Sequence, residues 1–389
     1  MLVIIMMMAV LSVYGAFNKV PEAKKIELGT DARVVLLDAN GSEHEIGTIA
    51  KRNIATYRVI DTDGSKDYDA ASVDRYDSTT RVIFQSRLKN KFFNSSNLFL
   101  ILKDSSFFAI MAVGMTGVII LAGIDLSVGS IYGLSAIVGA MAISALPQDA
   151  SIFIALPVGL AVCIAVGTMC GLANGSMSVG LRVHPFVITL GMMAALRGLT
   201  VVLPQEIYST QSIGGFPTSF TSGFFKAKIA GVYPVPVIIM ALVAAAGWFV
   251  LSRTVFGRRI FAIGGNETAA QYAGIPVGKV KILVYTITGA LCGLSACIYL
   301  GYLGAAETNA GNAYELQVIA ATVIGGASLM GGRGTAVGAV LGAIIIQLIN
   351  NAMVIFSVDQ SYNQIVMGAA IVIAVVIDQT KQRVQARRG

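Results

Sequence analysis

Charged residues are scarce in this sequence. Only 13% of its 389 residues are Asp, Glu, Lys or Arg, whereas a soluble domain of ordinary composition carries about a quarter. Hydrophobic residues make up 55% of the chain, and apolar runs of about 20 residues, enough to cross a bilayer as a helix, recur along it. An outer-membrane barrel would instead show alternating segments of roughly ten residues. The composition therefore predicts an all-α polytopic membrane protein.

Motifs of nucleotide-binding and hydrolytic enzymes are also missing. The nearest approach to a phosphate-binding P-loop, Gly274-Ile-Pro-Val-Gly278-Lys279, has the wrong spacing and is followed by Val280. The chain has two histidines and neither a zinc-protease nor a serine-hydrolase motif. We therefore expect no ATPase site, no catalytic residue, no metal and no cofactor, and these absences argue against an enzyme.

Cysteine is rare, with four residues in the chain, and all four lie in apolar runs: Cys163, Cys170, Cys292 and Cys297. Their spacing matches neither a CxxC motif nor a metal site, so they are interpreted as small packing residues. The net charge of +7 needs no nucleic-acid partner, because basic residues beside membrane spans serve to orient them.

The apolar runs predict about ten transmembrane helices. The predicted spans are 2–17, 105–123, 126–146, 152–172, 186–203, 235–251, 282–303, 314–331, 337–356 and 362–378. They make residues 1–17 a first helix and residues 92–378 the main transmembrane domain. An even number of spans leaves both termini on one side, and the basic tail at 379–389 places that side in the cytoplasm.

Residues 18–91 differ sharply from the rest of the chain. Twelve of the 21 acidic residues lie in this segment, between short β-branched or apolar runs at 33–37, 45–49, 56–60 and 81–84. Asn40-Gly41 and Asp63-Gly64 between such runs are typical of hairpin turns. The segment therefore predicts a small, mostly β insertion outside the bilayer, on the extracytoplasmic side. A polar loop without regular structure is the alternative that its high charge leaves open.

A basic, glycine-punctuated segment at residues 253–281 separates two of the predicted spans. The count of spans places it in the cytoplasm, and a plain orienting link would explain its charges. The pattern from Asn266 to Gly274 is more specific, because Asn266 is a good N-cap, Glu267 suits a first turn and Gly274 a helix end. We therefore expect a short helix that docks in a groove of a soluble partner.

Several polar residues interrupt the membrane segments. Asp125 follows a break at Gly123, and either caps the next helix near Ser127 or serves a proton or cation relay. The capping interpretation is favoured by the helix-start pattern. Asn174, Gln317 and Asn350 fit cross-helix hydrogen bonds. Together with Asp125 and Ser127 they are the candidate lining of a polar path for a hydroxyl-rich solute.

Four motifs, in order, resemble the inner-membrane permease subunits of bacterial ABC importers for monosaccharides, of the ribose, xylose and galactose type. They are GIDLSVGS at 123–130, VHPFVITLGMMAALRGLT at 183–200, TVFGRRIFAIGGNETAAQYAGIPVGKVK at 254–281 and ELQVIAATVIGGASLMGGRGTAVGAVLGA at 315–343. The resemblance covers roughly residues 92–378. His184 departs from the family's usual proline, and the insertion at 18–91 is foreign to it.

The resemblance implies a bundle of about ten helices in the bacterial plasma (inner) membrane. It also implies three kinds of partner: cytoplasmic ATPase subunits, an extracytoplasmic sugar-binding protein, and a second permease copy in a homodimer or heterodimer. In the family, the loop at 264–274 couples the permease to the ATPase. The residues expected to form the ATPase-coupling loop here are Arg258, Gly264, Asn266, Glu267, Ala270, Gly274 and Lys279.

The leading hypothesis is therefore a permease subunit that translocates a monosaccharide or similar polyol, driven by ATP hydrolysis on a partner. The alternative is a stand-alone ion- or proton-coupled secondary transporter. Such a transporter needs intramembrane ionisable pairs, and the sequence is interpreted as offering only Asp125.

Overall fold

The chain forms two compact units, one covering Met6–Asn97 and the other most of the remaining chain from Leu98 onward. The computed structural model describes residues 7–13, 19–28, 32–45, 54–61, 64–69, 73–77, 82–90, 92–229, 232–370, 372 and 376. The predicted tail at 379–389 and the ends of the first and last predicted spans lie outside the described residues, although residues 7–13 and 363–370 are helical.

The first unit contains two antiparallel sheets in its described residues. Its strands are β1 (Lys19–Glu27), β2 (Arg33–Leu37), β3 (Glu43–His44), β4 (Thr56–Asp61), β5 (Gly64–Asp69), β6 (Val73–Asp77) and β7 (Val82–Asn90). The sheet orders are β1-β7-β6 and β3-β2-β4-β5. Strand β1 pairs with β7 along its whole length, from Lys19 opposite Asn90 to Glu27 opposite Val82.

The hairpin signals in this unit agree with the strand pairing. Strands β2 and β3 pair around Asn40-Gly41, and Gly41 has a φ of +79°, which glycine adopts at little cost. Strands β4 and β5 pair with Asp61 opposite Gly64, while Asp63 lies outside the described residues. Side chains such as Leu36, Val59 and Ile83 form a core, so this unit buries apolar surface of its own.

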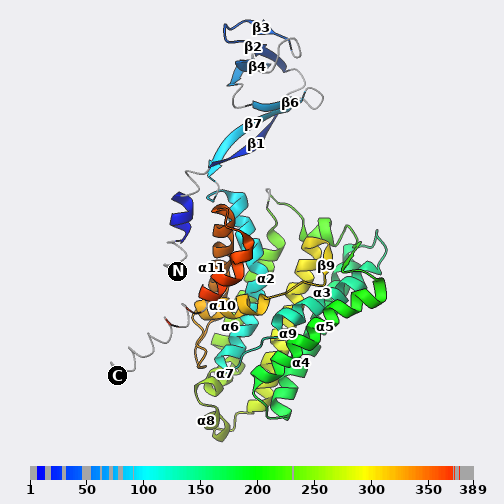
Figure 1. Cartoon of the computed structure of the whole chain (residues 1–389), viewed down its shortest axis with the longest axis vertical. Coiled ribbons are helices and arrows are strands. Elements are labelled where there is room, and N and C mark those ends of the chain that lie inside the picture. The colour runs from blue at the N-terminus through cyan, green and yellow to red at the C-terminus, as the bar shows by residue number, and fades with distance from the viewer. Residues whose placement is uncertain are drawn as a thin grey trace, which may run out of the picture. The chain divides into compact units, whose positions relative to one another are not determined.

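The second unit is a helix bundle (Figure 1). Six of its helices, in the described part of the chain, are long and apolar enough to cross a membrane: α2 (Ser95–Ile120), α4 (Ile152–Gly180), α5 (Pro185–Tyr208), α6 (Pro234–Arg253), α9 (Val277–Leu303) and α11 (Ala336–Ile355). Two apolar helices are shorter, α3 (Val128–Ser144) and α10 (Tyr314–Ile324). The remaining elements are α7 (Val255–Gly265), α8 (Glu267–Tyr272), the π-helix Thr221–Phe225, the 3₁₀ turn Gln360–Tyr362 and the strand pair β8 (Ser212–Gly214) and β9 (Ala305–Glu307).

Several boundaries differ from the sequence prediction, α2 beginning at Ser95 and not at residue 105, and two of the differences have a clear physical reason. The span predicted at 314–331 is not one helix, because α10 ends at Ile324 and Gly326 follows with a φ of +95°. The span predicted at 152–172 extends further, because α4 continues to Gly180. Asn174 and Ser178 there are buried, and hydropathy alone cannot distinguish a buried polar turn of helix from an exposed link.

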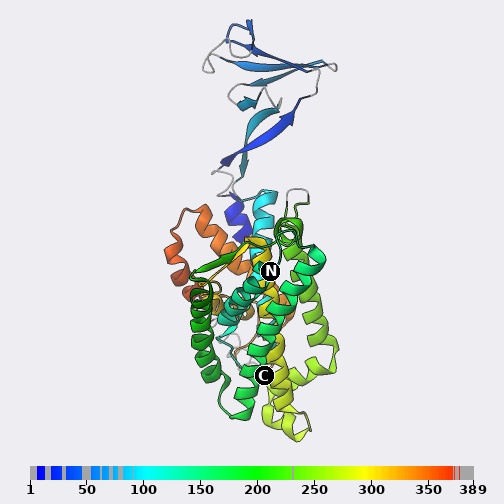
Figure 2. The same ribbon diagram turned by 90° about the vertical axis from the view of Figure 1, so that its right-hand side faces the viewer.

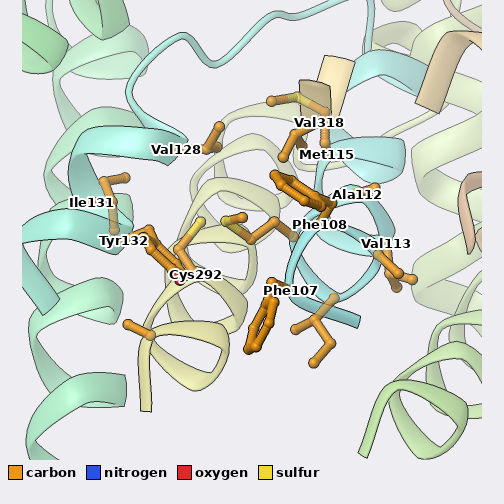
Figure 3. Close-up of a cluster of buried hydrophobic side chains, with 14 of the residues drawn as sticks. Phe107, Phe108, Ala112, Val113, Met115, Val128, Ile131, Tyr132, Cys292 and Val318 are labelled. Carbon is orange, nitrogen blue, oxygen red and sulfur yellow. The ribbon is translucent and has the colours of Figure 1, made fainter. Parts of the chain in front are cut away.

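The core of the bundle lies where α2, α3, α9 and α10 meet. Figure 3 shows Phe107, Phe108 and Met115 of α2 beside Tyr132 of α3 and Cys292 of α9. The aromatic rings of Tyr132 and Tyr299 lie 5.5 Å apart at an inclined angle, an arrangement that aromatic pairs favour. All four cysteines are free and buried, as expected for packing residues.

Helices α4 and α9 run side by side (Figures 1 and 2), in contact through glycines. A Cβ atom on Gly289 would overlap the carbonyl oxygen of Gly167, and one on Gly293 would overlap that of Cys163. Glycines let membrane helices approach this closely, and van der Waals packing then holds the pair.

Replacing Gly289 with alanine should therefore destabilise the bundle. The new methyl group meets backbone atoms that cannot rotate away, and overpacking of this kind costs about 1–3 kcal/mol. The measurement is thermal unfolding of the detergent-solubilised protein. Gly191→Ala in α5 is the matched control, because nothing lies within 4 Å of the added atom. Equal melting temperatures for the two variants would contradict the proposed backbone contact.

Candidate functional site

A cluster of buried polar side chains links the break between α2 and α3 to helix α4. The Oδ1 atom of Asp125 accepts hydrogen bonds from the backbone N–H of Ser127 at 2.9 Å and from its hydroxyl at 2.6 Å. The side-chain amide of Asn174 in α4 donates to the Ser127 hydroxyl at 2.8 Å and to Oδ2 of Asp125 at 3.4 Å. All three residues are fully buried.

The capping prediction for Asp125 is confirmed in part. Its carboxylate accepts the N–H of Ser127, the residue that precedes α3. Ser127 is itself the N-cap, but its side chain makes no capping bond: its hydroxyl donates to Asp125 and its oxygen accepts from the Asn174 amide. The break is held tightly on its other side, since a Cβ on Gly123 would come within 2.7 Å of the Tyr285 hydroxyl. The carboxylate is thus stabilised by neutral donors.

Asp125, Ser127 and Asn174 bring hydrogen-bond acceptors and donors together away from solvent. The Oδ1 atom of Asn174 is buried and has no hydrogen-bond partner, so the cluster keeps an acceptor available. Among the described residues, no Arg, Lys or His side chain bonds to Asp125 in the hydrogen bonds and ion pairs of the chain. The geometry suits a hydrogen-bonded contact that holds the helices together, or a contact with a hydroxyl group of a solute. It does not suit an ion-paired proton or cation relay.

Gln317 and Asn350 lie apart from this cluster. Gln317 is half-buried in α10, and its Oε1 atom has no partner. Asn350 is half-buried in α11, where its amide donates to Oε1 of Gln347 at 3.2 Å on the same helix. None of the hydrogen bonds found among the described residues joins either side chain to Asp125. The structure therefore brings together three of the five predicted path residues.

Arg197 and Glu315 were missed by the sequence analysis, which took Asp125 for the only carboxylate deep in an apolar region. Arg197 lies in α5 and donates through Nη1 to the carbonyl of Ala310 at 2.7 Å. Glu315 lies in the first turn of α10, and its Oε2 atom is buried against Gly129 without a partner. The signal was available, because Arg197 is the lone charge in the predicted span 186–203, and such charges usually face the bundle interior.

The predicted short helix is present as α8, within a larger helical loop than expected. Oδ1 of Asn266 accepts the N–H of Ala269 at 2.9 Å, and Gly274 ends the element with a φ of +79°. Ala270 is the buried residue of this helix. Glu267 forms an ion pair with Lys281 of α9 at 2.7 Å. Helix α8 is therefore fastened at its start and on one face.

The outer face of α8 is open. Tyr272 is 88% exposed, an unusual setting for a large aromatic side chain unless a partner covers it. Arg258 and Lys279, two of the residues predicted for this loop, are exposed in the neighbouring helices α7 and α9. Sequence reasoning missed Tyr272, although an aromatic residue in a short polar helix is a typical anchor of an interface.

Gly264 has a packing role that the sequence did not reveal. A Cβ atom there would overlap the carbonyl oxygen of Ile120 at the end of α2. The N–H of Gly332 donates to that same oxygen at 2.8 Å, and Gly331 and Gly332 both have positive φ angles. The glycine-rich run at 331–334 thus forms a close crossing and a tight turn, and it lies against α7.

Comparison with known proteins places residues 97–375 in one family. The matching family model is described as branched-chain amino acid transport system / permease component. The chain is 42% identical to the ribose import permease protein RbsC of Escherichia coli K12 over 76% of this chain and 90% of that protein. It is also similar to the D-allose transport system permease protein AlsC, at 38% over 76% and 87%, and to the galactose/methyl galactoside import permease protein MglC, at 36% over 77% and 90%, both from the same organism. No solved structure matches the chain.

Removing the amide of Asn174 should destabilise the protein, because the Asn174→Ala variant loses both bonds to Asp125 and Ser127. Losing a partner of a buried polar group costs about 1–3 kcal/mol. Thermal unfolding in detergent measures the loss. Asn350→Ala is the control, since its bond stays within one helix, and it should change the melting temperature less. A larger effect at Asn350 would show that the cluster does not hold the bundle.

Proposed function

The chain belongs to the permease family described as branched-chain amino acid transport system / permease component, and from that premise we propose that it moves a monosaccharide or similar polyol across the bacterial inner membrane. It is a permease component of an ABC importer, hence a transport subunit and not an enzyme, and the ATP is hydrolysed on a partner subunit. The printed names of the relatives refer to ribose, D-allose and galactose, which supports a monosaccharide as the solute.

The family implies an ATPase and a binding protein as partners. Helix α8 is the proposed contact with the ATPase. It is short, capped by Asn266 and joined to α9 through Glu267 and Lys281, while Tyr272 is exposed. A helix of this kind can transmit a movement, because it is joined to α7 and to the long helix α9 and presents an aromatic anchor. This exposed, fastened helix is the observation that carries the proposal.

We propose ten membrane segments with both termini in the cytoplasm. The six long apolar helices supply six segments, and the shorter α3 and α10, with the helical residues 7–13 and 363–370, supply the others. The basic residues 253, 258, 259, 279 and 281 support a cytoplasmic position for α7 and α8. The strand-containing segment 18–91 is then extracytoplasmic, on the side of the sugar-binding protein.

A second permease copy, the same or different, is the proposed partner within the membrane. Helices α4, α5 and α6 are long and apolar, yet 22% or less of the residues in their most apolar windows are buried within the chain. Their outer faces are covered by lipid or by another permease. We place the solute path along the buried cluster of Asp125, Ser127 and Asn174, with Gln317 and Asn350 as separate polar contacts.

The alternative of a stand-alone secondary transporter gains one observation from the structure. Arg197 and Glu315 are half-buried residues of opposite charge that both lie against α3, and intramembrane charges of this kind can serve ion coupling. Arg197, however, is engaged by the carbonyl of Ala310, and the family consists of permease components. Ion coupling is therefore not favoured.

Co-expression with an ATPase and a sugar-binding protein from the same organism tests the function. We expect a co-purifying complex that takes up radiolabelled D-ribose or D-galactose into proteoliposomes only when ATP is enclosed with the ATPase. Tyr272→Ala should reduce ATPase co-purification and uptake at least tenfold, because anchors of this kind contribute about 2 kcal/mol or more. The fold should stay intact because that side chain is exposed.

The matched control for this variant is Tyr362→Ala. Tyr362 is also an exposed tyrosine, at 55%, and lies outside the proposed docking loop. It should leave assembly and uptake unchanged. Uptake that persists without ATP, or that collapses with an ion gradient, would instead identify a secondary transporter, and normal uptake in Tyr272→Ala would remove α8 from the docking role.

Single introduced cysteines test the orientation. The four native cysteines are buried, so a membrane-impermeant maleimide should report only the new residue. Asn40→Cys, in an exposed turn, should react in intact spheroplasts. Gln271→Cys, on exposed α8, should react only after the spheroplasts are lysed. The reverse pattern would invert the proposed topology.

A further inference from the structure

An apolar groove runs along the half of α6 that leads to α7. Its volume is about 190 Å³, and every residue that lines it is apolar or glycine. On α6 the lining extends from Val243 to Leu251, which is about 12 Å of helix and close to half the thickness of the hydrocarbon core of a bilayer. The other walls come from α2, α7 and α9, and they include Val113, Gly114, Phe256, Ile260, Val284 and Ile287.

The groove reaches the surface of the bundle. Ala246 of α6 and Ile287 of α9 both line it and are both exposed. An apolar cavity of about 150 Å³ stays free of water and accepts a small apolar ligand. Around a membrane helix the apolar ligand at hand is the acyl chain of a lipid, and the groove has the direction and length that one leaflet's chains require.

Arginine side chains gather where the groove ends and α6 leads into α7 (Figure 1). Arg253 is the last residue of α6, three residues after Val250 and seven after Ala246, so it continues the same edge of the helix. Arg259 lies three residues after Phe256 on α7 and is its neighbour on the helix surface. Both arginines are exposed, and neither takes part in an ion pair within the residues that the structure describes.

The setting of Arg253 is that of a membrane–water interface. Its guanidinium lies over the ring of Trp248, 5.7 Å from the ring centroid, and Trp248 is half-exposed. Tryptophan is enriched at the level of the lipid headgroups, and a planar guanidinium can stack on a ring through its face while its N–H groups donate in its plane. An orienting role would explain the arginines alone, but it would not explain the groove that leads to them.

We propose that the groove, Arg253 and Arg259 together bind an anionic phospholipid. One acyl chain lies in the groove along α6, and the headgroup phosphate accepts hydrogen bonds from the two arginines. A free phosphate would gain nothing from the groove, and a zwitterionic lipid would add a cationic group beside the arginines. The bound lipid contacts α2, α6, α7 and α9, and so holds α7, which precedes the docking helix α8, against the membrane domain. The site is independent of which solute is carried.

Native mass spectrometry of the purified full chain in detergent tests the headgroup contact. Titrations with phosphatidylglycerol and with phosphatidylcholine of the same acyl chains give the Kd for the first bound lipid of each kind. The unmodified chain should bind phosphatidylglycerol about tenfold or more tightly, because each basic residue near a lipid headgroup favours negative charge. Arg253→Gln/Arg259→Gln should bind both lipids about equally.

The matched control for the arginines is Lys226→Gln/Lys228→Gln. It also removes two positive charges, but at the other end of α6, where Lys228 lies over the ring of Tyr233, the residue that precedes the helix. It should keep the preference for phosphatidylglycerol. A loss of preference as large as that of the arginine variant would overturn the proposed site, as would equal binding of the two lipids by the unmodified chain.

Filling the groove tests the acyl-chain contact. Ala246→Phe places a ring in the groove and should weaken the binding of both lipids about tenfold, while the ratio of their Kd values stays the same. Ala245→Phe is the control, because Ala245 is also exposed on α6 but is not part of the groove lining. Both variants should melt like the unmodified chain in detergent, since both alanines are exposed, and this comparison excludes misfolding as the cause.

Other occupants would give different results. Unchanged lipid binding by Ala246→Phe would overturn the proposal, and dissociation of a dimer in that variant would then assign the groove to a second permease copy. Loss of ATPase co-purification in the arginine variant, with the preference for phosphatidylglycerol unchanged, would assign the arginines to the ATPase instead.

Discussion

The backbones of α4 and α9 touch directly, because Gly167, Gly289 and Gly293 carry no side chain at the crossing. In a bilayer there is little hydrophobic drive to hold two helices together, so the contact depends on close van der Waals packing. This packing fixes the register between the two helices. The register in turn places Asn174 of α4 at the buried carboxylate of Asp125 and Tyr285 of α9 at the break before it. The polar features of the bundle thus depend on an apolar contact.

A series of direct contacts also leads from the end of α2 to α8. Ile120 at the end of α2 receives the N–H of Gly332 and lies against Gly264 of α7. Helix α7 is followed at once by α8, which is paired with α9 through Glu267 and Lys281. A movement of α8 would therefore shift the end of α2, which lies just before the break that contains Asp125. Such contiguity is a physical route for coupling, and its two end states would have to be measured.

Much of this arrangement could be predicted from the sequence, for identifiable reasons. Long apolar runs predicted the six long helices, and local signals at Asn266 and Gly274 predicted α8, because caps act through neighbours in the chain. The extension of α4 through Asn174 was missed, since its polar residues are satisfied only by partners distant in sequence. Arg197 was missed because its partner, the carbonyl of Ala310, is also distant in sequence, and Glu315 because its burial against Gly129 arises only in the tertiary fold. Hydropathy likewise predicted a full span at residues 314–331, where two glycines and a turn end α10 early.

The pairing of β1 with β7 has a consequence for the history of the chain. Lys19 lies opposite Asn90, and partners in adjacent strands are separated by only about 5 Å. The first and last residues of this strand-containing segment therefore lie close together in space. A segment with such adjacent ends, and with a core of its own, can be gained or lost by a single genetic event without stretching what remains. The family match at 97–375 begins just after it, so a permease lineage could have acquired this module whole.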